Sequence, residues 1–231
     1  MEPHAVSSRI FVIWITVYRI SFPYIHLRMQ LYFASGRGVL EMARIVVIVG
    51  HARTATYCEA LGESYVKGAQ AGGHEVKLFV TSRMTFDPIL HEGFERAQPL
   101  EEDLKEAHDA ILAADHLVFV FPLWLGTLPA IFKGFLERVM QPDLVALSKK
   151  QKFPKLLKGK SARVIVTMGM PGLIYRWVFG AYALKMLKRN ILRFLGVAPV
   201  RSLVYGNVEG VGSKGRGKWL KDVEKLGHDA A

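Results

Sequence analysis

The sequence from Met42 onward predicts an α/β domain in which a doubly wound, five-stranded parallel sheet carries helices on both faces. Two observations predict this class. Apolar runs rich in β-branched residues alternate with segments that have helical spacing. Runs such as 44–50 and 116–122 are almost entirely apolar, which is typical of strands buried on both faces of a parallel sheet. Since no internal repeat or second domain interrupts the alternation, we expect one sheet with right-handed crossovers.

The individual elements are predicted from local signals along the chain. The first helix is expected to end at Gly72 and Gly73, because glycine is common at helix C-termini. The helix after the third strand carries Pro129 in its first turn, where a missing N–H is harmless. The expected strands are 44–50, 74–82, 116–122, 162–169 and 200–205. The expected helices are 56–71, 100–114, 128–140, 176–195 and 214–227.

Length and composition limit the kinds of protein that this chain can be. Its 231 residues can bury one good-sized core, and its apolar content is ordinary for a soluble α/β protein. The net charge of +11 favours anionic partners such as phosphorylated cofactors or an acidic membrane face. We expect no nucleic-acid binding, because no recognised module accompanies the charge. The single cysteine, Cys58, excludes an intramolecular disulfide and a metal site of several thiolates. A reducing, cytoplasmic setting is therefore expected, and no metal site.

Residues 1–41 differ in character from the rest and form an N-terminal extension in this interpretation. The run from Ile10 to Tyr18 is apolar apart from Thr16, but it is shorter than the roughly 20 residues that a spanning helix needs. Three hypotheses are open. In the first, Met42 is the true translation start and the extension is absent from the native protein. In the second, the extension is a hydrophobic arm or a peripheral membrane anchor. In the third, it is a signal or spanning segment, although no convincing cleavage site follows.

Ligand chemistry is expected in three connections of the predicted sheet. An open parallel sheet binds its ligand beyond the carboxyl ends of its strands, where the strand order reverses. The connections after the first, third and fourth strands are 50–57, 122–128 and 169–175. The first of them enters a helix, and the free amides of a helix N-terminus suit a phosphate group.

Each connection contains residues suited to a flat, phosphorylated ligand, and each also has a plainer interpretation. In the first, Arg53 and the hydroxyl of Thr56 can hold a phosphate, or Thr56 merely caps the helix. In the second connection, the Trp124 ring either packs against an aromatic ligand or packs against neighbouring residues of the protein. In the third, Gly169 lets backbone amides approach a ligand and stabilise negative charge on it. Tyr175 either supplies a phenol to the site or is a core ring with its hydroxyl at the surface.

Together, the three connections resemble the NAD(P)H:quinone oxidoreductase family, the flavodoxin-like enzymes that include DT-diaphorase and bacterial modulators of drug activity. The resemblance covers about residues 44 to 205. Its motifs are G-H-A-R-x-x-T-Y at 50–57, FPLW followed by G-x-L-PA-x-x-KGF-x-ER at 121–138, and T-x-G ending in Tyr at 167–175. The middle motif is the most specific of the three.

The resemblance implies a flavodoxin-like fold, a bound FAD or FMN, NAD(P)H as co-substrate, and a homodimer. It implies that the flavin phosphate or ribityl chain is held by His51, Arg53, Thr56 and Tyr57. One edge of the isoalloxazine would be lined by Pro122, Leu123, Trp124 and Leu125, and the other edge by Thr167, Gly169 and Met170. Tyr175 matches a family tyrosine that lies over the flavin near the hydride acceptor, and it is the predicted catalytic residue. The DT-diaphorase branch has a histidine six residues further on, where this chain has Ala181. Tyr175 and backbone amides would therefore act without it.

The implied activity is two-electron hydride transfer from NAD(P)H, through the flavin, to a quinone or similar acceptor. An alternative from the same resemblance is a flavin-binding ancillary subunit that regulates a membrane transport protein. The basic charge is compatible with that alternative and argues against a one-electron flavodoxin. The helix predicted at 176–195 mixes apolar and basic residues. Three roles are open for this helix: it covers the active site, it forms the dimer interface, or it contacts a membrane as a peripheral element.

Overall fold

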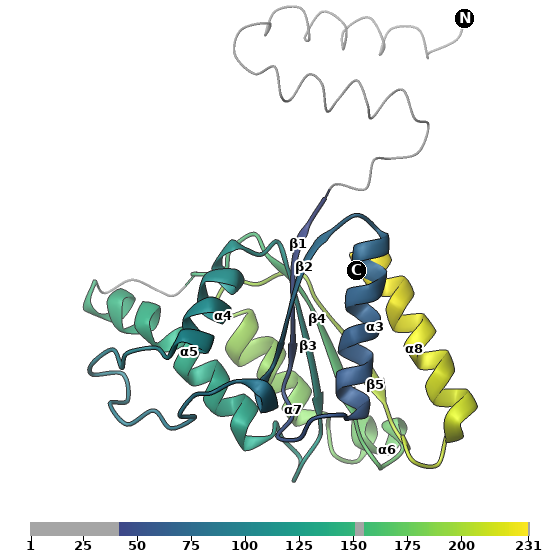
Figure 1. Ribbon diagram of the computed structural model, residues 1–231. Coiled ribbons are helices and arrows are strands. Elements are labelled where there is room, and N and C mark those ends of the chain that lie inside the picture. Colours follow the sequence, from purple (N-terminus) through teal and green to yellow (C-terminus); the bar gives the residue numbers. More distant parts are fainter. Residues whose placement is uncertain (1–41, 151–154, 231) are drawn as a thin grey trace, which may run out of the picture. The chain divides into compact units, whose positions relative to one another are not determined.

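The computed structural model describes residues 42–150 and 155–230, and it confirms the predicted fold class. Its five strands form one parallel sheet in the order β2-β1-β3-β4-β5 (Figure 1). The strands are β1 (Arg44–Val49), β2 (Glu75–Val80), β3 (His116–Pro122), β4 (Ser161–Thr167) and β5 (Val200–Tyr205). The hypotheses about residues 1–41 concern a segment outside the described residues.

Different helices cover the two faces of the sheet (Figure 1). On one face, α3 (Tyr57–Ala71) and α8 (Gly212–His228) pack over alternate side chains of β1 and β3, including Val47 and Val118. On the other face, α4 (Glu102–Ala113) and α5 (Ala130–Lys149) pack over Ile48 and Phe119, together with the segment between β4 and β5. Because the central strands lie between two apolar layers, their sequences are apolar at consecutive positions.

Glycines let α3 and α8 approach each other closely. A Cβ built on Gly68 would overlap the backbone oxygen of Glu224, and one built on Gly227 would overlap that of Tyr65. Backbone atoms cannot swing aside as the end of a side chain can, so the helices would have to move apart. We expect Gly68→Ala to lower the free energy of unfolding by about 1–3 kcal/mol in a urea titration. The matched control is Gly217→Ala on α8, where an added Cβ meets nothing within 4 Å. It should leave stability unchanged or raise it by up to about 1 kcal/mol, and equal losses in both variants would contradict the prediction.

The prediction of one continuous helix over 176–195 is wrong. The structure has α6 (Gly172–Trp177), α7 (Tyr182–Lys185) and a π-helical segment (Met186–Leu192) in its place. The chain reverses at Gly180 and Ala181, whose φ angles of 61° and 50° are left-handed and end a right-handed helix. A single glycine is tolerated within helices, so the sequence pattern alone did not locate this break.

The helix after β3 is longer than predicted. The expected end was at residue 140, but α5 continues through Pro142 to Lys149. Proline removes one backbone N–H and usually ends or kinks a helix, and here α5 continues past it. The remaining boundaries of the predicted elements agree with the structure to within two residues.

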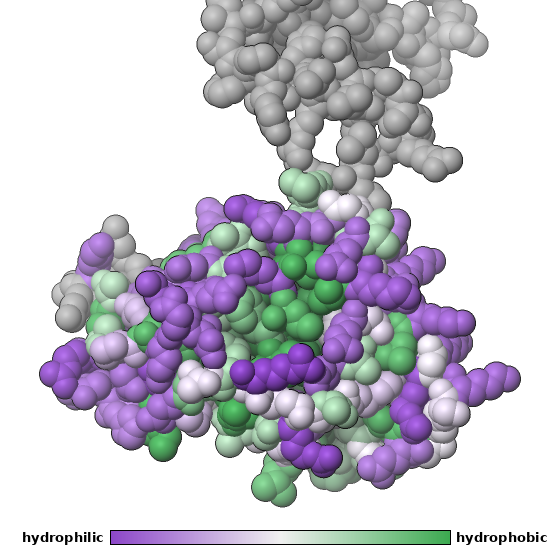
Figure 2. Space-filling model, viewed as in Figure 1, coloured by the Kyte–Doolittle hydropathy of each residue, from purple (hydrophilic) through white to green (hydrophobic). Residues whose placement is uncertain are grey.

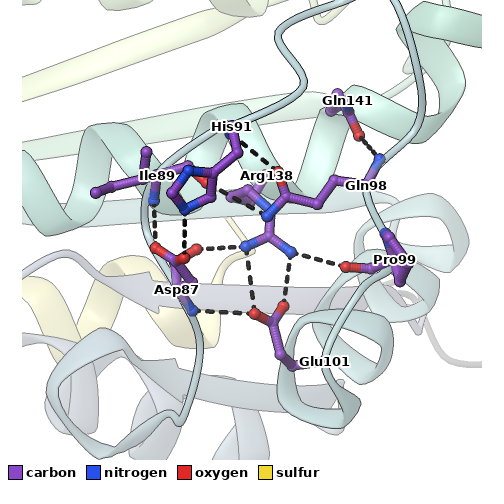
Figure 3. Close-up of polar contacts among 8 residues, drawn as sticks. All are labelled: Asp87, Ile89, His91, Gln98, Pro99, Glu101, Arg138 and Gln141. Carbon is purple, nitrogen blue, oxygen red and sulfur yellow. Dashed lines mark hydrogen bonds and ion pairs between the residues drawn. The ribbon is translucent and has the colours of Figure 1, made fainter.

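The long connection 84–101 between the end of β2 and α4 is fastened to α5 by two side chains (Figure 3). Arg138 is fully buried, and its Nη2 donates to the Pro99 carbonyl and to the Glu101 carboxylate, each at 2.8 Å. Its Nη1 donates to the Asp87 carbonyl. Gln141, less than one turn further along α5, donates through Nε2 to backbone carbonyls of the same connection. Both ends of this connection are thereby held against α5.

A surface hollow of about 470 Å³ lies between α4 and the strands β1 and β2, and a smaller one of about 180 Å³ lies between β2 and the start of α4. In the view of Figure 2, apolar side chains are visible between hydrophilic ones across the middle of the molecule. Lys77 and Glu106 line the larger hollow and form an ion pair of 3.0 Å. Neither hollow is lined by a residue predicted to bind the cofactor.

Candidate active site

The predicted ligand crevice lies where the strand order reverses, beyond the carboxyl ends of β1 and β3. All three predicted connections emerge at that end of the sheet (Figure 1). The rings of His51 and Trp124 meet edge to face with their centroids 5.0 Å apart, which joins the first connection to the second. The Leu123 amide donates to the Thr167 carbonyl at 2.8 Å, which joins the second connection to β4. The three connections therefore form one rim.

Hydrogen bonds to the backbone fix the first connection. The His51 amide donates to Thr81 Oγ1 at 3.1 Å, and the Arg53 amide donates to His51 Nδ1 at 2.9 Å. Because Nδ1 accepts, Nε2 carries the proton of the neutral ring. Desolvation, followed by the charge of Arg53, lowers the pKa of His51. Its ring is therefore neutral at neutral pH and offers an Nε2–H donor.

Helix α3 begins at the end of this connection. Thr56 is its N-cap and accepts from the Glu59 amide at 3.3 Å, so the interpretation of Thr56 as a helix cap is confirmed. The side chain of Arg53 is exposed beside this end of the helix. The Tyr57 hydroxyl donates to the Arg216 carbonyl at 2.9 Å and so ties α3 to α8. That hydroxyl is thus engaged within the protein.

Two residues that the sequence interpretation missed, Glu59 and Arg83, shape the first connection. The Glu59 carboxylate accepts from the Ala55 amide at 2.7 Å and pairs with Arg83, although Glu59 is only 3% exposed. Thr56 and Glu59 have the spacing of a capping box, and this signal could have pointed to Glu59. Arg83 ends the short 3-10 helix Thr81–Arg83 that follows β2, and it belongs to no motif. Only the fold could therefore reveal its contact with Glu59.

The second connection is a tight turn that presents an apolar side chain to solvent. Trp124 and Thr127 exchange backbone hydrogen bonds of 3.0 and 2.9 Å. The residues between them, Leu125 and Gly126, have φ angles of 46° and 78°. The left-handed conformation costs leucine about 1–2 kcal/mol, and such strain concentrates at functional sites. Leu125 is fully exposed and Trp124 is 41% exposed, so both side chains are accessible to a ligand.

The third connection begins beside buried residues at the ends of β3 and β4, which form the floor of the candidate site. Thr167 is buried, and its Oγ1 lies 3.1 Å from Cys58 Sγ in the first turn of α3. Burial raises the pKa of the Cys58 thiol to about 11, so the thiol stays protonated and is a poor nucleophile. Pro122, paired with Thr167 in the sheet, is also buried. Beyond this floor Gly169 is exposed, with nothing within 4 Å of an added Cβ, and Met170 is half-buried.

Tyr175 lies in the core beneath the rim. Its side chain is 1% exposed, and its hydroxyl accepts from the Leu184 amide at 3.2 Å. Burial raises the pKa of this phenol. Tyr175 therefore joins α6 to α7 across the reversal at Gly180 and Ala181, which agrees with the interpretation of a core ring but places its hydroxyl inside the protein. A catalytic contact by Tyr175 stays a prediction.

Comparison with known proteins places the chain. A family model described as a flavodoxin-like fold matches residues 43–226. The chain belongs to this family. An uncharacterized NAD(P)H oxidoreductase of Haemophilus influenzae is 27% identical over 176 residues, which cover 74% of this chain and 87% of the relative. An FMN-dependent NADH:quinone oxidoreductase of Macrococcus caseolyticus is 25% identical, covering 71% and 86%.

A solved structure shares the fold. The NAD(P)H:quinone oxidoreductase from Methanothermobacter marburgensis superposes with a TM-score of 0.66 at 21% identity, covering 82% of this chain and 96% of that one. This superposition shows the predicted fold. The family match and the curated relatives agree with the predicted resemblance to the NAD(P)H:quinone oxidoreductase family.

The described residues contain neither a membrane-spanning helix nor a cluster of metal-binding side chains. None of the helices over 42–150 and 155–230 is both long and apolar enough to cross a bilayer. In the same part of the chain, no three or more His, Cys, Asp or Glu side chains are grouped as a metal site would require.

Proposed function

We propose that this chain is a flavin-dependent NAD(P)H oxidoreductase that passes two electrons to a quinone or similar acceptor. The observation that carries the proposal is the single rim at the β1/β3 reversal, where all three connections with family motifs meet. Relatives named NAD(P)H oxidoreductase and FMN-dependent NADH:quinone oxidoreductase support the same reaction class.

The residues of the rim fit a flavin. The backbone is open at Gly126 and Gly169, where an added Cβ meets nothing within 4 Å, and Arg53 is exposed beside the first turn of α3. We assign the phosphate or ribityl chain to the first connection. It would be held by the Arg53 guanidinium, the Thr56 cap, Tyr57 and the His51 Nε2–H donor.

The ring is assigned to the space between the second and third connections. Trp124 and Leu125 would supply apolar contacts from one side, and the backbone of Gly169 and Met170 would meet the other edge. Pro122, Leu123 and Thr167 form the floor and hold this backbone in place. A bound flavin supplies hydride transfer, and the chain positions the rings and places amide donors where negative charge develops.

The bound chromophore is the decisive measurement. Purified full-length protein should be yellow, or should become yellow when FMN or FAD is added, and the spectrum together with the extracted flavin will distinguish the two cofactors. With NADH or NADPH and a soluble quinone, steady-state rates should follow a ping-pong pattern. Protein that stays colourless with both flavins would reject the proposal. No observation of the described residues favours the alternative of an ancillary subunit.

We further propose that the protein acts in the cytoplasm and forms a homodimer, as the family resemblance implies. The chain has a mass of 25.9 kDa, so light scattering of the purified protein should give twice that value. A monomeric mass at the assay concentration would contradict the proposed dimer. It would not bear on the proposed reaction, which the flavin spectrum and the steady-state rates test separately.

Leu125→Gly separates stability from ligand binding. Glycine relieves the left-handed backbone at this position, and the lost side chain contacts solvent, so the free energy of unfolding should stay unchanged or rise by up to about 1 kcal/mol. Flavin affinity should fall by about tenfold, because one apolar contact with the ring is lost. Fluorescence titration with FMN and FAD measures the affinity. Ile89→Gly removes another exposed apolar side chain, which belongs to the connection 84–101 and to none of the three connections of the rim, and should leave affinity unchanged. An unchanged affinity in Leu125→Gly would remove Leu125 from the site.

A further inference from the structure

The segment that follows the third connection exposes an apolar surface. Six large apolar side chains between residues 173 and 182 lie on the surface, and we call them the 173–182 patch. Its members are Leu173, Ile174, Trp177, Val178, Phe179 and Tyr182, with exposures between 43% and 83%. Isolated exposed apolar residues are common, but a contiguous group of this size marks an interaction surface.

The patch is held in place by the fold. Tyr175 is buried beneath it, and its hydroxyl accepts from the Leu184 amide, so the turns on both sides of the reversal are anchored in the core. Gly180 and Ala181 have left-handed backbone conformations that turn the chain between α6 and α7. The apolar side chains are therefore presented from anchored turns.

The charges in the stretch of sequence that carries the patch are all positive. Arg176 lies within it, and Lys185, Arg189 and Arg193 follow on the next turns with exposed side chains. The Lys185 ammonium lies 5.3 Å from the centroid of the Tyr182 ring. The sequence contains no Asp or Glu between Asp143 and Glu209, so no acidic neighbour in that stretch offsets these cations.

We propose that the 173–182 patch and its four cations dock the protein onto an anionic lipid bilayer surface. Tryptophan, tyrosine and phenylalanine side chains partition into the interfacial region of a bilayer, and nearby arginine and lysine side chains are attracted to anionic headgroups. The patch directly follows Gly169 and Met170 in the chain, so docking brings the rim of the site to the membrane surface. A lipophilic quinone dissolved in the bilayer then lies close to the rim, a consequence that rests on the proposed function.

Charge favours a lipid surface over a second copy of the chain as the occupant. An isologous interface through this patch would bring the same four cations from each copy to one interface. The stretch between Asp143 and Glu209 offers no carboxylate to pair with them, and unpaired like charges oppose association. A bilayer rich in phosphatidylglycerol supplies both the apolar interior and the opposite charge.

The test is vesicle flotation of the full-length protein without nucleotide or quinone. Wild-type protein should float with vesicles that mix phosphatidylglycerol with phosphatidylcholine, and it should bind vesicles of phosphatidylcholine alone about tenfold less well. The double variant Trp177→Ser/Phe179→Ser should bind the mixed vesicles about tenfold or more weakly. Its matched control, Ile89→Ser/Phe94→Ser, removes two exposed apolar residues from the connection 84–101 and should bind as wild type.

A charge variant gives a second readout that does not alter the apolar surface. Arg189→Gln/Arg193→Gln changes two exposed side chains and should reduce binding to mixed vesicles only, whereas Lys218→Gln/Lys221→Gln on α8 should not. Residues 1–41 are common to all variants, so their contribution cancels in each comparison.

Three results would overturn the proposal. The first is equal flotation of the patch variant and wild type, and the second is no flotation of either. The third is a halving of the mass of the patch variant in light scattering with no vesicle binding, which would assign the patch to a second copy. Turnover with a soluble quinone is measured separately, so failure of docking is distinguishable from failure of the proposed reaction.

Discussion

Arg138→Met is expected to lower the free energy of unfolding by about 3–5 kcal/mol. The Arg138 guanidinium is fully buried and bonds the carbonyls of Asp87 and Pro99 at the two ends of the connection 84–101. It also pairs with Glu101, with N–O distances of 2.8 and 3.2 Å. Methionine keeps much of the volume, but it leaves two backbone carbonyls without their donor. It also takes the partner from the Glu101 carboxylate, whose side chain is 34% exposed.

The pKa of Glu101 agrees with this role for Arg138. Desolvation alone would raise the pKa of the Glu101 carboxyl, but hydrogen bonds from backbone amides, including that of Asp87, and from Arg138 lower it below its ordinary value. The folded protein therefore favours the charged carboxylate. Removal of Arg138 takes away part of what stabilises that charge.

Urea unfolding of Arg138→Met and wild type measures the loss. Arg96→Ala is the matched control, because Arg96 belongs to the same connection but forms an ion pair with Glu92 through a side chain that is 75% exposed. Exposed pairs of this kind contribute about 0–1 kcal/mol. If Arg138→Met lost less than about 1 kcal/mol, the connection would be held by other contacts, of which those of Gln141 are the strongest candidates.

The sheet could be predicted from the sequence because burial on both faces leaves a simple pattern. A strand such as β3 has no solvent-facing side and is apolar at consecutive positions, so its limits coincide with the apolar run. The prediction was less accurate for the region after β4. There the apolar spacing continues across Gly180 and Ala181, and the reversal depends on the burial of Tyr175 and its bond to Leu184, which are tertiary contacts.

The sequence predicted which connections form the candidate site. It predicted less well which side chains in those connections face a ligand. Topology brings the ends of β1, β3 and β4 together, so any motif at those ends must lie on one rim. Which atoms face a ligand depends on packing. Thr167 faces Cys58 and Tyr57 reaches Arg216, whereas Leu125 is fully exposed. The most specific motif also includes Arg138, whose described contacts hold the connection 84–101 instead of reaching the rim.

His116 should make the protein less stable as the pH falls from about 6.5 to 4. Its ring is 5% exposed at the start of β3, and Nδ1 lies 2.7 Å from Ser161 Oγ. Within the described residues, Nε2 is buried without a hydrogen-bond partner. Desolvation, and then the charges of Arg163 and Arg201, lower the pKa of His116 to about 4. The folded state therefore holds the ring neutral, while an unfolded chain binds a proton below about pH 6.5.

The sign follows from proton uptake on unfolding. Stability from the neutral ring is fully present above about pH 6.5, and it is lost as the pH falls towards 4, because only the unfolded state gains a proton in that range. By linkage, His116 accounts for a loss of about 2 kcal/mol between pH 8 and pH 5. Urea titrations at the two pH values should show that His116→Gln removes this part of the loss. His91→Gln, at an exposed position, should keep it, because His116 is still present. The same pH dependence in His116→Gln and wild type would mean that the ring accepts a proton inside the fold, and the strand would then have to open or admit water at its amino end.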